Sequence, residues 1–208
     1  MTFLKKFILT LINSNTDKSQ RKYNLLSDED LVKQINENQN TLLFSILYDR
    51  YSKKVYNKCY SFVNNEDEAK DLTQDIFLKL FTKLYSFKGN SKFSTWLYSF
   101  TYNFCVNYVK RDTSKKINSI SKPLDKNDYH MSEIEDIEDQ TLFDLKASKL
   151  DKALSMIDPD DKAILLLKYQ DDVSIKDLQA TLKIGESAVK MRLKRAKVKV
   201  IEAYNKIE

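Results

Sequence analysis

Apolar and aromatic residues recur every three or four positions along most of this chain, which is the spacing of an amphipathic α-helix. The longest unbroken pattern extends from Thr41 to Val63, and Asn64 and Asn65 interrupt it. We therefore predict a long helix over this stretch and a second helix after the two asparagines, extending to about Leu84. The side chains expected on the buried face of the first helix are Leu43, Leu47, Tyr51 and Val55.

Three further helix starts are marked by residues that can bond to the free N–H groups at the beginning of a helix. Ser27 stands three positions before Asp30, and Ser174 three positions before Asp177, which is the spacing of a capping box. Asp158 followed by a proline is the third signal. Because the 208 residues include only two glycines and two prolines, we predict an all-α protein.

A stretch of different composition divides the helical pattern into two blocks. It contains Pro123, few large apolar residues and an acidic run, and it shows no sustained period. This composition is typical of a flexible linker. We predict an N-terminal tail over 1–26, a first helical domain over 27–112, this linker over 113–141 and a second helical domain over 142–208.

Composition narrows the class of protein further. Charged residues make up 31% of the chain, which excludes a body embedded in a bilayer. The apolar run in Met1–Ile12 is too short for a signal peptide, and two isolated thiols fit a reducing compartment, so we expect a cytoplasmic protein. Cys59 and Cys105 stand alone, without the spacing of a zinc or redox site. They are expected to be buried, and no cofactor or metal is predicted.

A polar face is expected on the helix that ends near Leu84. If Leu72, Ile76 and Leu80 form its buried row, Asp71, Gln74 and Asp75 face outward. Such a face is common on solvated helices, and it also suits a protein partner. A nuclease built on the two carboxylates would need a divalent metal and a third ligand, and the sequence offers no convincing third ligand.

A basic, aromatic loop follows that helix. Gly89 and Asn90 can adopt the left-handed backbone of a tight turn, and Lys88 and Lys92 lie on either side of them. Ser94 is the expected cap of the next helix.

The helix after the loop, predicted over about Thr95–Arg111, is apolar on most sides and carries one polar strip. Rings, amides and lysines in this arrangement suit single-stranded DNA, because bases stack on aromatic rings and amides bond to base edges. For Trp96 taken alone, a position in the core is the simpler interpretation. The strip consists of Trp96, Ser99, Asn103, Asn107 and Lys110.

The C-terminal end combines a helix-turn-helix pattern with positive charge. Two helical patterns are joined by Lys183–Gly185, which is typical of a helix-turn-helix. Residues 183–199 carry seven bases and one acid, whereas residues 128–144 carry seven acids and no base. A solvated basic helix is the simpler alternative, but the cap, the turn and the charge together favour DNA binding. The side chains expected on the outer face of the last helix include Ser187, Lys190, Met191, Lys194 and Arg195.

These segments resemble a known family. Asp71–Phe77, with the sequence DLTQDIF, and Trp96–Asn103, with the sequence WLYSFTYN, are similar to region 2 of bacterial RNA polymerase sigma factors of the extracytoplasmic-function group. The block that begins at Leu150 is similar to region 4 of the same sigma-70 family. The two blocks also occur in the order that this family has.

The resemblance implies roles for individual residues. For binding of core RNA polymerase it implies Asp71, Gln74, Asp75 and Phe77. For the melted minus-ten strand it implies Lys88, Asn90, Lys92, Phe93, Trp96, Asn103 and Lys110. For the minus-thirty-five duplex it implies Ser187, Lys190, Met191, Lys194 and Arg195.

A protein of this kind directs core RNA polymerase to promoters and assists DNA melting, without catalysis of its own. The implied partners are core polymerase and promoter DNA, both as duplex and as melted strand. Members of this class are commonly held inactive by an anti-sigma factor, which would be a further partner. The alternative is a conventional helix-turn-helix regulator that binds a symmetric duplex site without core polymerase.

Overall fold

The computed structural model describes residues 23, 25–38, 41–118 and 137–207. Within these ranges the regular elements are all helices, which confirms the predicted all-α class. The described residues form two compact units that divide within one long helix, after Tyr102. Most of the predicted N-terminal tail and residues 119–136 of the predicted linker lie outside the described residues.

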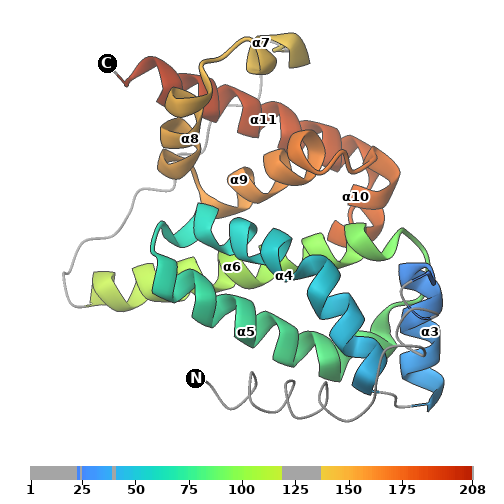
Figure 1. Cartoon of the computed structure of the whole chain (residues 1–208). Coiled ribbons are helices and arrows are strands. Elements are labelled where there is room, and N and C mark those ends of the chain that lie inside the picture. Colours follow the sequence, from blue (N-terminus) through green and yellow to red (C-terminus); the bar gives the residue numbers. More distant parts are fainter. Residues whose placement is uncertain (1–22, 24, 39–40, 119–136, 208) are drawn as a thin grey trace. The chain divides into compact units, whose positions relative to one another are not determined.

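The first unit contains the helices of the first predicted domain (Figure 1). They are α3 (Asp28–Asn38), α4 (Thr41–Val63), α5 (Glu66–Lys83), the short 3₁₀ helix η1 (Leu84–Ser86) and the first part of α6 (Phe93–Asn118). The bounds of α4 are those predicted. Asn64 ends this helix in the left-handed conformation with φ 50°, and Asn65 caps α5 by accepting bonds from the backbone N–H groups of Asp67 and Glu68 at 3.0 Å.

The helix α6 is longer at both ends than predicted. It begins at Phe93, so Ser94 lies inside its first turn and is not its cap. It also continues to Asn118, six residues beyond the predicted domain end at 112. The physical reason is that 113–118 contain neither proline nor glycine, so nothing in the sequence stops the helix there.

α4 and α5 pack against each other along the first unit, and α3 packs on α4 (Figure 1). The predicted core rows are confirmed: Leu43, Leu47, Tyr51 and Val55 of α4 and Leu72, Ile76, Leu80 and Leu84 of the α5 region are all buried. Both cysteines are also buried, as expected. This packing leaves one side of α5 exposed.

Besides the second part of α6, the described residues of the second unit form five helices and one π-helical turn (Figure 1). They are α7 (Asp139–Phe143), α8 (Ala147–Met156), α9 (Pro159–Leu165), the π turn η2 (Leu166–Gln170), α10 (Ile175–Leu182) and α11 (Glu186–Asn205). α8, α9 and α10 all pack on α11. Val189, Leu193, Ala196 and Val200 of α11 are buried, on the side away from its predicted outer face.

The segment 137–141, predicted as the end of a linker, is part of this unit. Asp139 accepts hydrogen bonds from the Tyr169 hydroxyl at 2.6 Å and from the Lys197 ammonium at 3.0 Å, and Leu142 is buried. Composition alone did not reveal this docking, because the two partners of Asp139 lie 30 and 58 residues away in the chain.

Candidate nucleic-acid and polymerase interfaces

The outer face of α5 carries the predicted polar residues. Asp71 and Asp75 are exposed and Gln74 is half-buried. Leu78 lies seven residues after Asp71, on the same side of the helix, and is 45% exposed. Leu78 and Phe81, which is 42% exposed, form an apolar extension of this polar face. A face with carboxylates at one end and large apolar side chains at the other suits a protein partner better than solvent alone.

The structure corrects the placement of Phe77 on this face. The side chain is 1% exposed, and its ring packs against Tyr48 at 4.7 Å and Phe44 at 6.3 Å between ring centroids. Phe77 therefore supports the face from the interior and is not available to a partner.

The basic loop, residues 85–92, begins within η1, ends before α6 and has the predicted turn. Gly89 adopts φ 71°, a left-handed conformation that strains residues with a side chain. Lys88, Asn90 and Lys92 are exposed. Three polar or positively charged side chains therefore project from a loop whose backbone is bent by a glycine.

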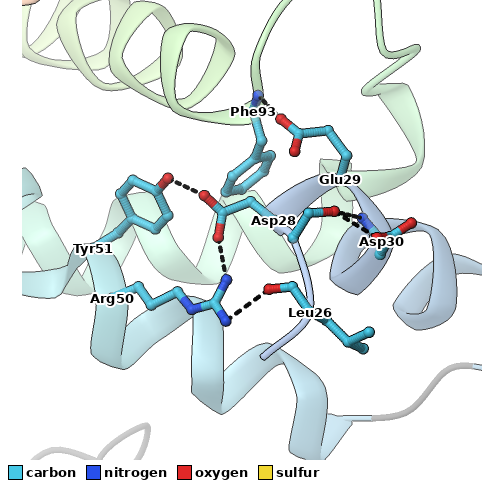
Figure 2. Close-up of polar contacts among 8 residues, drawn as sticks. Leu26, Asp28, Glu29, Asp30, Arg50, Tyr51 and Phe93 are labelled. Carbon is cyan, nitrogen blue, oxygen red and sulfur yellow. Dashed lines mark hydrogen bonds and ion pairs between the residues drawn. The ribbon is translucent and has the colours of Figure 1, made fainter. Parts of the chain in front are cut away.

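The two ends of this loop are held by residues of α3, which the sequence did not indicate. At the first end, the side-chain amide of Asn36 donates a hydrogen bond to the Leu84 carbonyl at 3.4 Å. At the second end, the backbone N–H of Phe93 donates to the Glu29 carboxylate at 2.7 Å (Figure 2). No local sequence pattern could have shown the second contact, because its partners lie 64 residues apart.

Phe93, assigned above to the melted strand, is buried, and this assignment is corrected. Its side chain is fully buried among the rings of Tyr51, Phe87 and Trp96, with centroid distances of 5.6, 5.6 and 6.0 Å. The ring cannot stack on a base without leaving the core. Its role in the structure is to fix the start of α6.

The strip on α6 is shorter than predicted. Trp96 is half-buried and lies nearly parallel to the Phe100 ring, with 5.8 Å between centroids and an angle of 22°. Ser99 is buried and donates its hydroxyl to the Thr95 carbonyl at 2.9 Å, so it does not belong to the strip. The exposed members along the helix are Asn103, Asn107 and Lys110.

The turn between α10 and α11 has the helix-turn-helix length. Ser174 caps α10 as predicted, accepting from the Asp177 N–H at 3.1 Å. Lys183 ends α10 in the left-handed conformation with φ 55°, and Gly185, with φ −68°, is the N-cap of α11. The residue with unusual backbone geometry in this turn is therefore the lysine and not the glycine.

The outer face of α11 is basic with an apolar centre. Ser187, Lys190 and Met191 are exposed, and Lys194 and Arg195 are half-buried. Near the start of the helix the Lys190 ammonium forms an ion pair with Glu186 at 2.6 Å. Met191 is 36% exposed and lies one turn after Ser187 and one turn before Lys194 and Arg195.

Two lysines that follow this face on α11 bind within the unit. Lys197 is buried and bonds to Asp139 and to the Ile137 carbonyl. Lys199 forms an ion pair with Asp161 at 2.5 Å. Burial acts to raise the pKa of Asp139, but the bonds from Tyr169 and Lys197 outweigh it and hold the pKa below its ordinary value. Both lysines therefore hold α11 to its own unit.

Neither a metal site nor a membrane span is found in the described parts of the chain. No cluster of three or more His, Cys, Asp or Glu side chains there could hold a metal ion. No helix there is long and apolar enough to cross a bilayer. The nuclease alternative thus gains no support from the described residues around Asp71 and Asp75.

Comparison with known protein families gives matches in both units. Residues 47–115 match sigma-70 region 2, and residues 147–200 match sigma-70 region 4. A similar protein is the ECF RNA polymerase sigma factor SigW of Bacillus subtilis, 26% identical over 172 residues, which covers 74% of this chain and 84% of the relative. Another is the ECF RNA polymerase sigma-E factor of Escherichia coli K12, 26% identical over 176 residues, covering 83% of this chain and 91% of the relative.

Two solved structures share the fold. The sigma factor RpoE in complex with the anti-sigma factor NepR, from Bartonella quintana, has a TM-score of 0.52 at 20% identity and covers 84% of this chain and 99% of its own. CnrH in complex with the cytosolic domain of CnrY has a TM-score of 0.53 at 18% identity, covering 87% and 99%.

Proposed function

Because this chain belongs to the extracytoplasmic-function group of the sigma-70 family, and is therefore an RNA polymerase sigma factor, we propose which of its surfaces performs each step of transcription initiation. The region 2 block, residues 47–115, binds core polymerase and the melted strand, and the region 4 block, residues 147–200, binds the upstream duplex. The observation that carries this division is the occurrence of region 2 and region 4 in one chain, in that order.

The polymerase-binding surface is the outer face of α5. Asp71 and Asp75 supply negative charge, Gln74 supplies hydrogen bonds, and Leu78 and Phe81 supply an apolar continuation of the same face. Charged groups determine orientation and association rate, whereas exposed large apolar groups contribute most of the buried area of an interface.

The melted-strand surface consists of the loop and the exposed strip of α6. Lys88 and Lys92 meet phosphates, Asn90 and Asn103 bond to unpaired base edges, and the half-buried Trp96 offers the exposed part of its ring for stacking. A base stacked on an aromatic ring contributes about 1–3 kcal/mol, which helps to hold the strand open. Lys110 is the last exposed member of the strip, and its ammonium forms an ion pair with the Asp160 carboxylate.

The upstream duplex is bound by the outer face of α11, inserted into the major groove. Lys194 and Arg195 can bond to guanine edges or phosphates, and Ser187 and Lys190 lie one to two turns nearer the start of the helix. Met191 in the centre of this face offers an apolar contact, and the apolar group that the major groove presents is the thymine methyl.

The protein acts without catalysis of its own, in the cytoplasm, where its polymerase partner and the chromosome are found. The two solved structures of the same fold are complexes with an anti-sigma factor or with a second protein's cytosolic domain. We include an anti-sigma factor among the partners of this chain on that basis.

Transcription from a promoter library with purified core polymerase tests this function. Core polymerase with the chain should yield transcripts from a set of templates that share two upstream elements, and core polymerase alone should not. Transcripts that do not depend on the chain would contradict the proposal. Binding of the chain alone to a symmetric duplex site would instead support a conventional regulator.

A further inference from the structure

We propose that α3 positions the melted-strand loop, residues 85–92, by holding both of its ends, and that Glu29 is the positioning residue at the end that leads into α6. The inference rests on the proposed function of this loop. It concerns residues of α3, which lie outside the region 2 match at 47–115.

Both ends of the loop bond to the same side of α3. Asn36 donates to the carbonyl of Leu84, the last buried residue before the loop, and Glu29 accepts from the N–H of Phe93, the first residue after it. Asn36 and Glu29 are seven residues apart, which is two helical turns, so their side chains project from one side of α3. One rigid element therefore spans the loop.

Glu29 is suited to this role by its charge. The first N–H groups of a helix have no partner within the helix, and a carboxylate there is favoured by the helix dipole. The Glu29 bond is charge-assisted and, at 2.7 Å, short. Because the Phe93 side chain is fully buried below it, this bond and the packing together determine where α6 starts and how the loop enters it.

α3 is itself fixed by a second group of contacts at its first turn (Figure 2). The Asp28 carboxylate accepts from the Arg50 guanidinium at 2.5 Å and from the Tyr51 hydroxyl, and Arg50 also donates to the Leu26 carbonyl at 2.9 Å. Burial, and then the bond to Asp28, raise the pKa of Tyr51, so its hydroxyl remains a donor. The Tyr51 ring in turn contacts Phe93.

The consequence is a loop that is ordered before DNA arrives. Gly89 gives the loop backbone wide conformational freedom, and ordering such a segment on binding would reduce affinity. With both ends held by α3, Lys88, Asn90 and Lys92 start from one arrangement. The affinity for the melted strand thus depends on α3, although no residue of α3 is assigned to DNA.

Three variants of the full chain test this inference: Glu29→Ala, Glu29→Gln and the control Glu37→Ala, which removes an exposed carboxylate of the same helix. The probe is a fluorescent single strand carrying the minus-ten sequence of a promoter that the chain transcribes, bound to the assembled holoenzyme. Loss of a charge-assisted bond predicts about tenfold weaker strand binding for Glu29→Ala. Glu29→Gln, which keeps an acceptor oxygen, should retain most of the wild-type strand affinity, and Glu37→Ala should match the wild type.

Two further measurements separate positioning from general stability. Affinity for core polymerase should be unchanged in all three variants. Trp96, the only tryptophan of the chain, lies beside Phe93, so iodide should quench its fluorescence more strongly in Glu29→Ala than in Glu37→Ala. Equal strand affinity for Glu29→Ala and Glu37→Ala would overturn the inference, as would a parallel loss of core binding. If the wild-type holoenzyme does not bind the strand, the proposed function of the loop is wrong. The positioning role of α3 is then tested by fluorescence alone, and equal Trp96 quenching in Glu29→Ala and Glu37→Ala would overturn it.

Discussion

The exposed carboxylate of Asp75 lies on the polar face of α5, between Asp71 and the apolar side chain of Leu78. Asp75→Lys should leave the fold intact, because the side chain projects into solvent, and should weaken association with core polymerase by about tenfold or more through charge reversal. Glu37→Lys, the same reversal at an exposed position of α3, is the matched control. Titration of core polymerase against labelled protein measures both, and equal affinities would remove α5 from the interface.

Met191 allows a sharper test of base recognition than any of the charged residues around it. If its side chain covers a thymine methyl, replacing that thymine by uracil should weaken wild-type binding about fourfold, since a buried methyl-sized group contributes about 0.8 kcal/mol. Met191→Ala should bind both duplexes equally. A uracil effect of the same size in Met191→Ala would show that another residue contacts the methyl group.

Individual residues also show where prediction from sequence stops. The resemblance assigned Phe77 to core polymerase and Phe93 to the melted strand. The structure buries them because rings from α4, at Phe44, Tyr48 and Tyr51, pack against them. Which side of a helix is covered depends on its neighbours in space, and a single-helix period does not contain that information.

At the scale of elements, the helix-turn-helix contains a strained residue. Lys183 holds φ 55°, a conformation that costs a residue with a side chain roughly 1–2 kcal/mol and costs glycine little. Lys183→Gly should therefore raise the free energy of unfolding of the second unit by about 1 kcal/mol. Ala180→Gly, an exposed position inside α10, should lower it by about 1 kcal/mol. If calorimetry showed a lower free energy of unfolding for both variants, Lys183 would not be a strained residue.

The docking of α7 should depend on pH through Asp139. Its pKa is held below the ordinary value in the folded unit, so the contact stabilises the docked form at neutral pH and is lost as the pH falls below the ordinary range of about 4. Hydrogen exchange in 137–143, corrected for its intrinsic pH dependence, should therefore accelerate at low pH. Asp139→Asn should exchange quickly already at pH 6. If hydrogen exchange in Asp139→Asn accelerated at low pH in the same way, a group other than Asp139 would be responsible for the pH dependence.

The helices themselves were largely predictable, whereas their mutual contacts were not. The period over 41–63 and the capping residues at Ser27, Asp158 and Ser174 gave starts and ends that the structure confirms. The contact of Glu29 with Phe93 and that of Asp139 with Lys197 each join residues distant in sequence. Such pairs follow from packing, which local propensity does not specify.

At the scale of the whole molecule, the chain joins two DNA-related units of different character. The first presents a carboxylate-bearing face on α5 and a basic loop, and the second presents a basic helix. Single-stranded and duplex DNA require different binding surfaces. Unpaired bases stack on exposed aromatic rings, whereas the major groove of the duplex admits a whole helix. The order of region 2 before region 4 combines both in one chain.

Permanganate footprinting of unpaired thymines on a promoter from the library tests the central claim most directly. Reactive thymines should appear in the minus-ten region when core polymerase and the chain are both present, and with neither alone. Asn103→Ala should reduce this reactivity while upstream binding persists, because Asn103 is exposed on α6 and far in sequence from α11. Unpaired thymines produced by core polymerase alone, or none with both proteins bound at the promoter, would contradict the account.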